Sequence, residues 1–279
     1  MEGGRGIGLV VLLLAGLVAG EVTFTSRYPY IGAMIGGEGE DAEVFCSAAL
    51  LAKDTAITAA RCIKGHKYER TRVKVCFGMH DPAREPSICS YVRRAVVHPD
   101  FRLNRPENDV AVFSLESAVG WRDVEGFGSR LRAVNISFSE VGDDLSLQHI
   151  GYRSKSAYIV ESRQMLYTSS FKQLAPQCNK SRLYRPDSPA ESKTDEFACT
   201  TEQMEAEGRT SLAGVNRGAF LLHTGPSYTK DFIVGLYSAS HDDYLDGSKG
   251  FFVRFSNHKR FILLGLGQFQ HRVPFAKHY

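Results

Sequence analysis

Short apolar runs, separated by glycine and charged turn residues, dominate the chain from residue 28 onward. The clearest runs span residues 30–35, 44–51, 56–60, 72–77, 91–97 and 110–115. Regular short strands with turn signals between them are typical of a β-sandwich or a β-barrel. One segment differs, because residues 257–264 place their apolar positions on one face of a helix. The pattern therefore predicts an all-β chain with one helix near its C-terminus.

The N-terminal residues have a different pattern. An apolar run of residues 6–20 follows Arg5 and ends in the small residues Ala19 and Gly20. This order matches the charged, apolar and cleavage regions of a secretory signal peptide. A membrane anchor is the competing interpretation, but it needs about 20 continuous apolar residues, and glycines interrupt this run. We therefore expect residues 1–20 to be removed and the mature chain to be secreted, soluble and extracellular, without a membrane span.

Length, charge and cysteine content narrow the possible functions. Subtracting those 20 residues from 279 leaves 259, which suits one large β domain or two small ones. A formal net charge of +3 is too small to indicate a nucleic-acid partner. The six cysteines are an even number in a chain expected to enter an oxidising compartment, so disulfides are favoured over a metal site. No CxxC or HxxxH spacing occurs, and no metal ion or cofactor is predicted.

Two tripeptides have the sequence of an N-glycosylation acceptor. Asn135 opens NIS and Asn179 opens NKS. Such tripeptides also occur by chance, and their use depends on secretion. We predict both asparagines as glycosylation sites of the secreted chain.

Several segments carry a resemblance to a known family. Residues 44–62 read VFCSAALLAKDTAITAARC, and residues 98–116 read HPDFRLNRPENDVAVFSLE. The first resembles the HFCGGSLI…VLTAAHC segment of the trypsin/chymotrypsin family of serine proteases, and the second resembles that family's HPxY…NDIALLKL segment. Later segments resemble the family in the same order: EFAC at 196–199, GVNRGAFLL at 214–222, IVGLYS at 233–238 and GFFVRF at 250–255. The resemblance covers nearly the whole mature chain.

The resemblance implies an all-β fold of two six-stranded antiparallel β-barrels with a C-terminal helix. The trypsin-like unit is expected over residues 21–264. Its parts are barrel 1 at about 28–121, barrel 2 at about 140–256 and the terminal helix at about 257–264. Residues 265–279 then form a C-terminal tail, whose role the sequence does not determine.

The cysteines fit the same resemblance. It implies two disulfides, Cys46–Cys62 and Cys178–Cys199. Cys76 and Cys89 remain, and they flank a turn-like stretch between two predicted strands. A bridge across that hairpin is the simplest proposal for them.

The resemblance places Arg61 where the family has its general base, a histidine, and Asn216 where it has the nucleophilic serine. Arginine stays protonated at physiological pH and has no acceptor lone pair, and an asparagine amide does not form an acyl-enzyme. Asp109 matches the family's aspartate. It is either a retained catalytic group or, as we favour, the partner of Arg61 in a bidentate ion pair. Arg217 replaces a glycine and is expected to project across the mouth of the cleft between the barrels.

A basic ridge offers a site without catalysis. Arg70, Arg72 and Lys74 occupy alternate positions, which places three cations on one face of a predicted strand. Such a ridge suits a sulfated polysaccharide or an anionic protein. An ordinary solvated strand face is the simpler interpretation.

These observations support one main hypothesis and two alternatives. The main hypothesis is a secreted, non-catalytic serine protease homologue that binds an extracellular protein, as a cofactor, decoy or inhibitor of proteolysis or in immune recognition. That list rests on analogy of fold. The first alternative is an active serine endopeptidase, and the second is a polyanion-binding protein that uses Arg70, Arg72 and Lys74. The sequence does not determine the partner or the oligomeric state.

Overall fold

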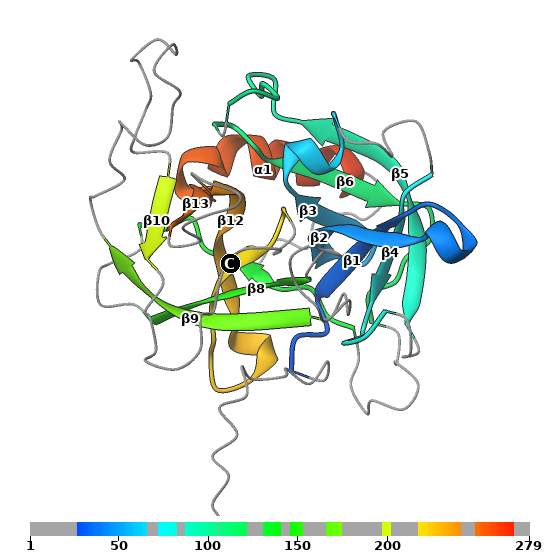
Figure 1. The fold of residues 1–279 in the computed structure, drawn as a ribbon, viewed down its shortest axis with the longest axis horizontal. Coiled ribbons are helices and arrows are strands. Elements are labelled where there is room, and N and C mark those ends of the chain that lie inside the picture. The colour runs from blue at the N-terminus through cyan, green and yellow to red at the C-terminus, as the bar shows by residue number, and fades with distance from the viewer. Residues whose placement is uncertain are drawn as a thin grey trace, which may run out of the picture.

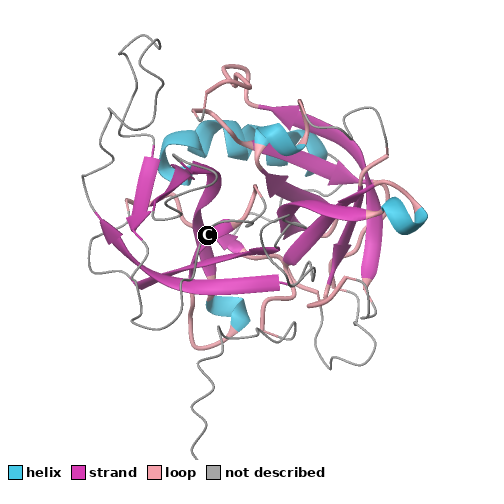
Figure 2. Ribbon diagram, in the orientation of Figure 1, coloured by secondary structure: helices cyan, strands magenta, loops and turns pink. Residues whose placement is uncertain are grey.

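A computed structural model of the chain consists mainly of β-strands, with one long helix at the C-terminal end of the described residues (Figures 1 and 2). The structure describes residues 27–65, 72–82, 87–105, 107–121, 131–140, 146–152, 166–174, 197–201, 217–240 and 249–270.

The first half of the chain forms a closed six-stranded antiparallel barrel, as the sequence predicts. The barrel order is β1-β2-β3-β6-β5-β4. Its strands are β1 (Ile31–Gly36), β2 (Glu43–Ala52), β3 (Thr55–Thr58), β4 (Lys74–Phe77), β5 (Ile88–Val97) and β6 (Ala111–Leu115). Short 3-10 turns, η1 (Gly39–Asp41) and η2 (Ala60–Cys62), follow β1 and β3. The strand expected at residues 72–77 begins only at Lys74.

The second half forms a seven-stranded sheet in the order β11-β8-β9-β10-β13-β12-β7. Its strands are β7 (Asn135–Ile136), β8 (Ser146–Tyr152), β9 (Leu166–Leu174), β10 (Phe197–Thr201), β11 (Phe220–His223), β12 (Phe232–Ser240) and β13 (Lys249–Arg254), with the 3-10 turn η5 (Tyr228–Lys230) before β12. An additional pairing joins β11 to β12. The strand pairings therefore form a circuit of six strands, which is consistent with a second barrel.

The C-terminal helix is longer than the sequence predicts. Helix α1 spans Phe255–Gln270, so the first part of the segment expected to be a tail belongs to the helix. The extension follows from packing, because Gly265 is buried against Val112 of β6. A Cβ atom on Gly265 would lie 3.0 Å from the Cβ of Val112. Helix α1 contacts β6 of the first barrel and β12 of the second sheet, and so links the two halves (Figure 1).

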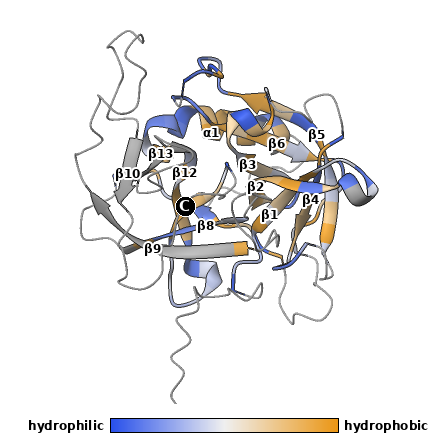
Figure 3. Cartoon of the chain, viewed as in Figure 1, coloured by the Kyte–Doolittle hydropathy of each residue, from blue (hydrophilic) through white to orange (hydrophobic). Residues whose placement is uncertain are grey.

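The apolar core follows from the two faces of the barrel strands. Val73 and Val75 point inward and are buried, whereas Lys74 between them is exposed. All five residues of β6 are buried, since one face of this strand lines the barrel and the other lies under α1. Apolar colour accordingly concentrates on β5, β6 and parts of α1 in Figure 3. Burial of this surface is the main force that holds the barrel together.

Two disulfides constrain the first barrel. Cys46 in β2 is bonded to Cys62 in η2, with Cα atoms 6.0 Å apart, and Cys76 in β4 is bonded to Cys89 in β5, with Cα atoms 4.1 Å apart. The second bond spans directly paired residues of neighbouring strands. Cys178 lies outside the described residues, so the Cys178–Cys199 pair stays a prediction.

A buried carboxylate ties the start of the first barrel to the second sheet. Asp231, just before β12, is fully buried and accepts hydrogen bonds from Arg27 through Nη1 and Nη2, the latter at 2.8 Å. It also accepts from the Tyr30 hydroxyl at 2.6 Å and from the Gly225 backbone nitrogen at 2.8 Å. Burial raises the pKa of Tyr30 above its ordinary value, and the hydrogen bond to Asp231 acts in the same direction. The hydroxyl therefore stays protonated and remains a donor.

Asp231→Asn is expected to lower the free energy of unfolding by about 2 to 4 kcal/mol, because a neutral amide weakens the interaction with Arg27 and cannot accept from every donor around it. Urea denaturation followed by circular dichroism measures this loss. Glu140→Gln is the control, since Glu140 makes an exposed ion pair with Arg254 at 3.0 Å. That substitution should cost less than about 1 kcal/mol. An equal loss in both variants would contradict the role given to Asp231.

Candidate functional site

The candidate site lies where the 3-10 turn η2 leaves strand β3. Arg61 is the middle residue of this turn, and the next residue, Cys62, is held to β2 by its disulfide. The Cys62 backbone nitrogen donates to the Ala59 carbonyl at 3.0 Å. The Thr58 hydroxyl donates to the Ser47 carbonyl at 2.7 Å. The backbone that carries Arg61 is thus fixed by a covalent bond and by hydrogen bonds on both sides.

Asp109 reaches the same place from the loop before β6. Asn108 has a left-handed backbone with φ of 55°, a conformation that asparagine adopts more readily than most residues. The Val110 backbone nitrogen donates to the Asn108 carbonyl at 2.8 Å, which closes a tight turn. This turn directs the Asp109 carboxylate into the protein, where it is fully buried.

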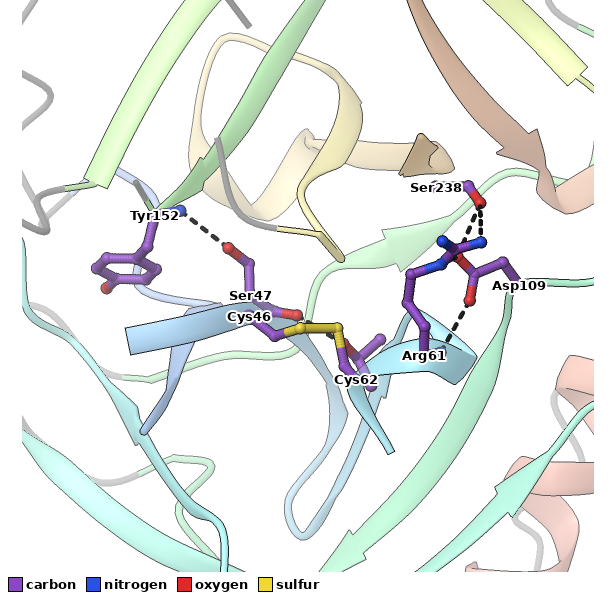
Figure 4. Close-up of a disulfide and its surroundings, with 8 residues drawn as sticks. Cys46, Ser47, Arg61, Cys62, Asp109, Tyr152 and Ser238 are labelled. Carbon is purple, nitrogen blue, oxygen red and sulfur yellow. Dashed lines mark hydrogen bonds and ion pairs between the residues drawn. A yellow bond between two sulfur atoms is a disulfide. The ribbon is translucent and has the colours of Figure 1, made fainter. Parts of the chain in front are cut away.

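Arg61 and Asp109 form an ion pair, as the sequence analysis favoured, but its geometry differs from the expected fork (Figure 4). The Arg61 Nε donates to Asp109 Oδ2, and the Arg61 backbone nitrogen donates to Oδ1 at 2.9 Å. One carboxylate oxygen is therefore bound by the side chain and the other by the main chain. The Arg61 Nη2 does not bind the carboxylate and donates to the Arg105 carbonyl at 3.1 Å.

Ser238 completes the network from the second sheet. Its hydroxyl donates to Asp109 Oδ2 at 2.7 Å and accepts from Arg61 Nη2 at 3.3 Å. Ser238 lies in β12, whereas Arg61 and Asp109 belong to the first barrel. The network therefore joins the two halves of the molecule, and Figure 4 shows the three side chains converging.

The electrostatics of the site are dominated by burial. Burial raises the pKa of Asp109, and the positive charge of Arg61 and the hydrogen bonds from Arg61 and Ser238 act in the opposite direction. The Arg61 side chain is only 11% exposed. A guanidinium has donors and no acceptor, so this group cannot take a proton from a nucleophile. The network thus supplies the buried Asp109 carboxylate with a counter-charge and three hydrogen-bond donors.

The second sheet approaches the disulfide at Arg217. The Ser47 backbone nitrogen donates to the Arg217 carbonyl at 3.0 Å, beside a parallel bridge between Cys46 and Arg217. Gly218 follows with φ of 79°, and a Cβ atom there would lie 2.4 Å from the Ser47 carbonyl oxygen. Close backbone contact thus requires glycine at 218. Arg217 is exposed, and its projection across the mouth of the cleft stays a prediction.

The structure separates the remaining predicted site residues into two groups. Asn216, Arg70 and Asn179 lie outside the described residues, so their roles stay predictions. Asn135 is exposed, and its Nδ2 donates to the Thr229 and Asp231 carbonyls at 3.3 and 3.2 Å. Glycosylation there also stays a prediction.

The basic ridge has a different charge balance from the one expected. Arg72 pairs with Glu116 at 2.5 Å, and its guanidinium carbon lies 4.1 Å from the centre of the Tyr91 ring. Arg72 is therefore a compensated cation, while Lys74 is exposed. The alternation of charges in residues 70–74 did not predict this ion pair, because Glu116 lies just after β6, far away in the sequence.

Ser238 is the site residue that the sequence analysis missed. Its segment, IVGLYS, was identified only as part of the family resemblance, and a lone serine carries no signal for a hydrogen bond to residue 109. The contact depends on how β12 meets the first barrel.

The part of the chain that the structure describes has no metal site and no membrane-spanning helix. No group of three or more His, Cys, Asp or Glu side chains there could hold a metal ion. No helix among the described residues is long and apolar enough to cross a membrane.

Fold and site together define a trypsin-type protein. A family model described as Trypsin matches residues 17–262 of the 279, and the chain therefore belongs to the trypsin family. It is similar to trypsin theta of Drosophila erecta, with 29% identity over 103 residues, and to trypsin theta of Drosophila melanogaster, with 27% identity over 103 residues. Each match covers 37% of this chain, and the chain spans only 37% of the length of these curated relatives.

Arg61→Ala is expected to lower the free energy of unfolding by about 3 to 5 kcal/mol, because it leaves the buried Asp109 carboxylate without its counter-charge. Chemical denaturation at pH 7 measures this loss. Arg105→Ala is the matched control, since Arg105 is exposed and gives the network only its backbone carbonyl. If both variants lose the same stability, Asp109 does not depend on Arg61.

The loss caused by Arg61→Ala should grow as the pH rises. Without Arg61, the burial of Asp109 is less opposed, and the pKa of this carboxyl in the folded state rises further above its unfolded value, which is near 3.9. A raised carboxyl pKa means that the folded state binds more protons than the unfolded state, so stability falls with rising pH above that unfolded value. Denaturation of both proteins at pH 5 and pH 7 checks this. A stability difference that is constant, or larger at pH 5, would contradict it.

Proposed function

We propose that this chain is a secreted, non-catalytic serine protease homologue that acts by binding another extracellular protein. The observation that carries the proposal is the Arg61 guanidinium, which is held by Asp109, Ser238 and the Arg105 carbonyl at the position where the resemblance expects a histidine. No histidine is among the hydrogen-bond partners of Arg61 or Asp109 in the described part of the chain. At the expected place of the base, Arg61 has no lone pair with which to take a proton from a nucleophile.

The identity of residue 216 adds to this argument. Asn216 stands at the expected place of the nucleophile, and its amide cannot form an acyl-enzyme. In a related type of catalytic triad, losing the serine or the histidine lowers turnover by roughly a million-fold. A protein that lacks both groups has no proteolytic function of physiological use, and binding is the function that the fold retains.

Secretion and protein binding rest on further observations. Disulfides such as Cys46–Cys62 and Cys76–Cys89 form and persist in oxidising compartments, which agrees with the predicted signal peptide. Arg217 is exposed next to the disulfide and is the binding residue that we propose at this site. Arginine is enriched among the residues that contribute most to protein interfaces.

An active serine endopeptidase is the second candidate, because the similar proteins from Drosophila are named trypsin theta. This candidate needs a base and a nucleophile from elsewhere in the chain. Covalent labelling of a serine separates the two functions without knowledge of the substrate.

Purified full-length protein is expected to show no labelling by a fluorophosphonate probe and no cleavage of a broad peptide library, because a non-catalytic chain has no activated serine to react. Active trypsin treated in parallel is the positive control. Mass spectrometry that locates the probe on a serine of this chain would contradict the proposal.

The double variant Arg61→His, Asn216→Ser tests how far the site has diverged. We expect it to restore little or no peptidase activity, because Val215 and Arg217 also replace the residues that the family has beside its nucleophile. Circular dichroism confirms that the variant is folded. High activity in the double variant would show that these neighbouring replacements do not matter.

A further inference from the structure

Four exposed basic side chains lie in the hairpin formed by β4 and β5 or just before β4. They are Arg72, Lys74, Arg93 and Arg94, all exposed, and we call them the basic ribbon. Two of them were part of the ridge expected from the sequence. The other two come from β5, which follows in the chain only after residue 87.

The strand register explains why these side chains share one face. Lys74 pairs with Tyr91, and the Val92 backbone nitrogen donates to the Val73 carbonyl at 3.0 Å. Continuing this register brings Arg72 opposite Arg93. Residues directly opposite each other in an antiparallel pair point to the same side.

A register irregularity in β5 adds the fourth cation. The pairing of β5 with β6 shifts between Val92 and Arg94, which is the position of a β-bulge. A bulge interrupts the alternation of side chains. Arg93 and Arg94 are therefore both exposed, although they are consecutive, whereas a regular strand would turn one of them inward.

The charge of the basic ribbon is mostly uncompensated. Glu116 neutralises Arg72, and the guanidinium of Arg72 also stacks on Tyr91. Lys74, Arg93 and Arg94 have no ion pair with a carboxylate among the residues that the structure describes. Within the described part of the chain, the ribbon thus has three cations without a carboxylate partner and one, Arg72, that is paired.

We propose that the basic ribbon binds a sulfated polysaccharide. Cations on alternate residues of a strand repeat about every 7 Å, and a linear polyanion presents its own charges in a repeating row. Long lysine and arginine side chains can adjust to such a chain, and its binding gains from the release of counterions. An acidic protein fits less well, because protein interfaces need a buried apolar centre. Among the described residues of this face, Tyr91 at 36% exposure is the only exposed large apolar side chain.

Binding to immobilised heparin tests this proposal with two variants of equal net charge. The first is the triple substitution Lys74→Ala, Arg93→Ala, Arg94→Ala. The second, a control, is Arg132→Ala, Lys230→Ala, Arg260→Ala, which removes three exposed cations from other segments. We expect affinity at physiological salt to fall at least tenfold in the first variant and less than twofold in the second.

The salt dependence supplies an independent readout. Each lost contact with a polyanion lowers the slope of log affinity against log salt by a little less than one, so the ribbon variant should lose about 2 to 3 in slope. Equal losses in the two variants would overturn the proposal, because net charge alone would then explain the binding.

Competition experiments on the wild-type protein do not depend on the folding of any variant. Soluble heparin should displace the protein from immobilised heparin, and fully desulfated heparin should not. Poly-glutamate that competes as well as heparin at equal charge would overturn the proposal in favour of an acidic protein. Binding by the basic ribbon does not depend on whether the chain is catalytic. If the protein has peptidase activity, the proposed function is contradicted, but the proposal for the basic ribbon is not.

Discussion

The contact between Arg61 and Asp109 is the constraint on which the site depends. Asp109 is fully buried, and a buried carboxylate requires a counter-charge and hydrogen-bond donors to remain ionised. Arg61 supplies the counter-charge with its guanidinium and a further donor with its backbone nitrogen. The Ser238 hydroxyl is the third donor. An imidazole offers fewer donors than a guanidinium, so the present arrangement favours a cation that never loses its proton.

The same network helps to hold the two halves of the molecule in register. Ser238 of β12 donates to Asp109 of the first half, and α1 contacts strands of both halves. Asp231 of the second half binds Arg27 and Tyr30 from the segment before β1. Two buried carboxylates, at 109 and 231, therefore lie on the boundary between the halves, each surrounded by donors from both sides. Polar contacts of this kind specify one relative arrangement, because a shifted interface would leave a buried charge without partners.

Local sequence patterns predicted much of this fold, and they failed where the answer depends on distant strands. The apolar runs located the strands of the first barrel, and the family motifs located Arg61 and Asp109. The helix was predicted too short, because residues 265–279 were expected to be a tail and the contact of Gly265 with Val112 is not visible in the sequence. The role of Ser238 and the approach of Glu116 to Arg72 depend on long-range pairing, which periodicity does not encode. The exposure of both Arg93 and Arg94 depends on a β-bulge that the residues of β5 do not predict.

The turn at Arg217 and Gly218 places opposite constraints on neighbouring residues. At 218 the Ser47 carbonyl and the Thr58 hydroxyl leave space for no side chain, and the left-handed backbone itself favours glycine. At 217 the side chain is exposed, and only the backbone is engaged by Ser47. Variation in related sequences should therefore be almost absent at the second position and broad at the first. The side chain at position 217 can therefore change between related proteins without any change in the backbone that carries it.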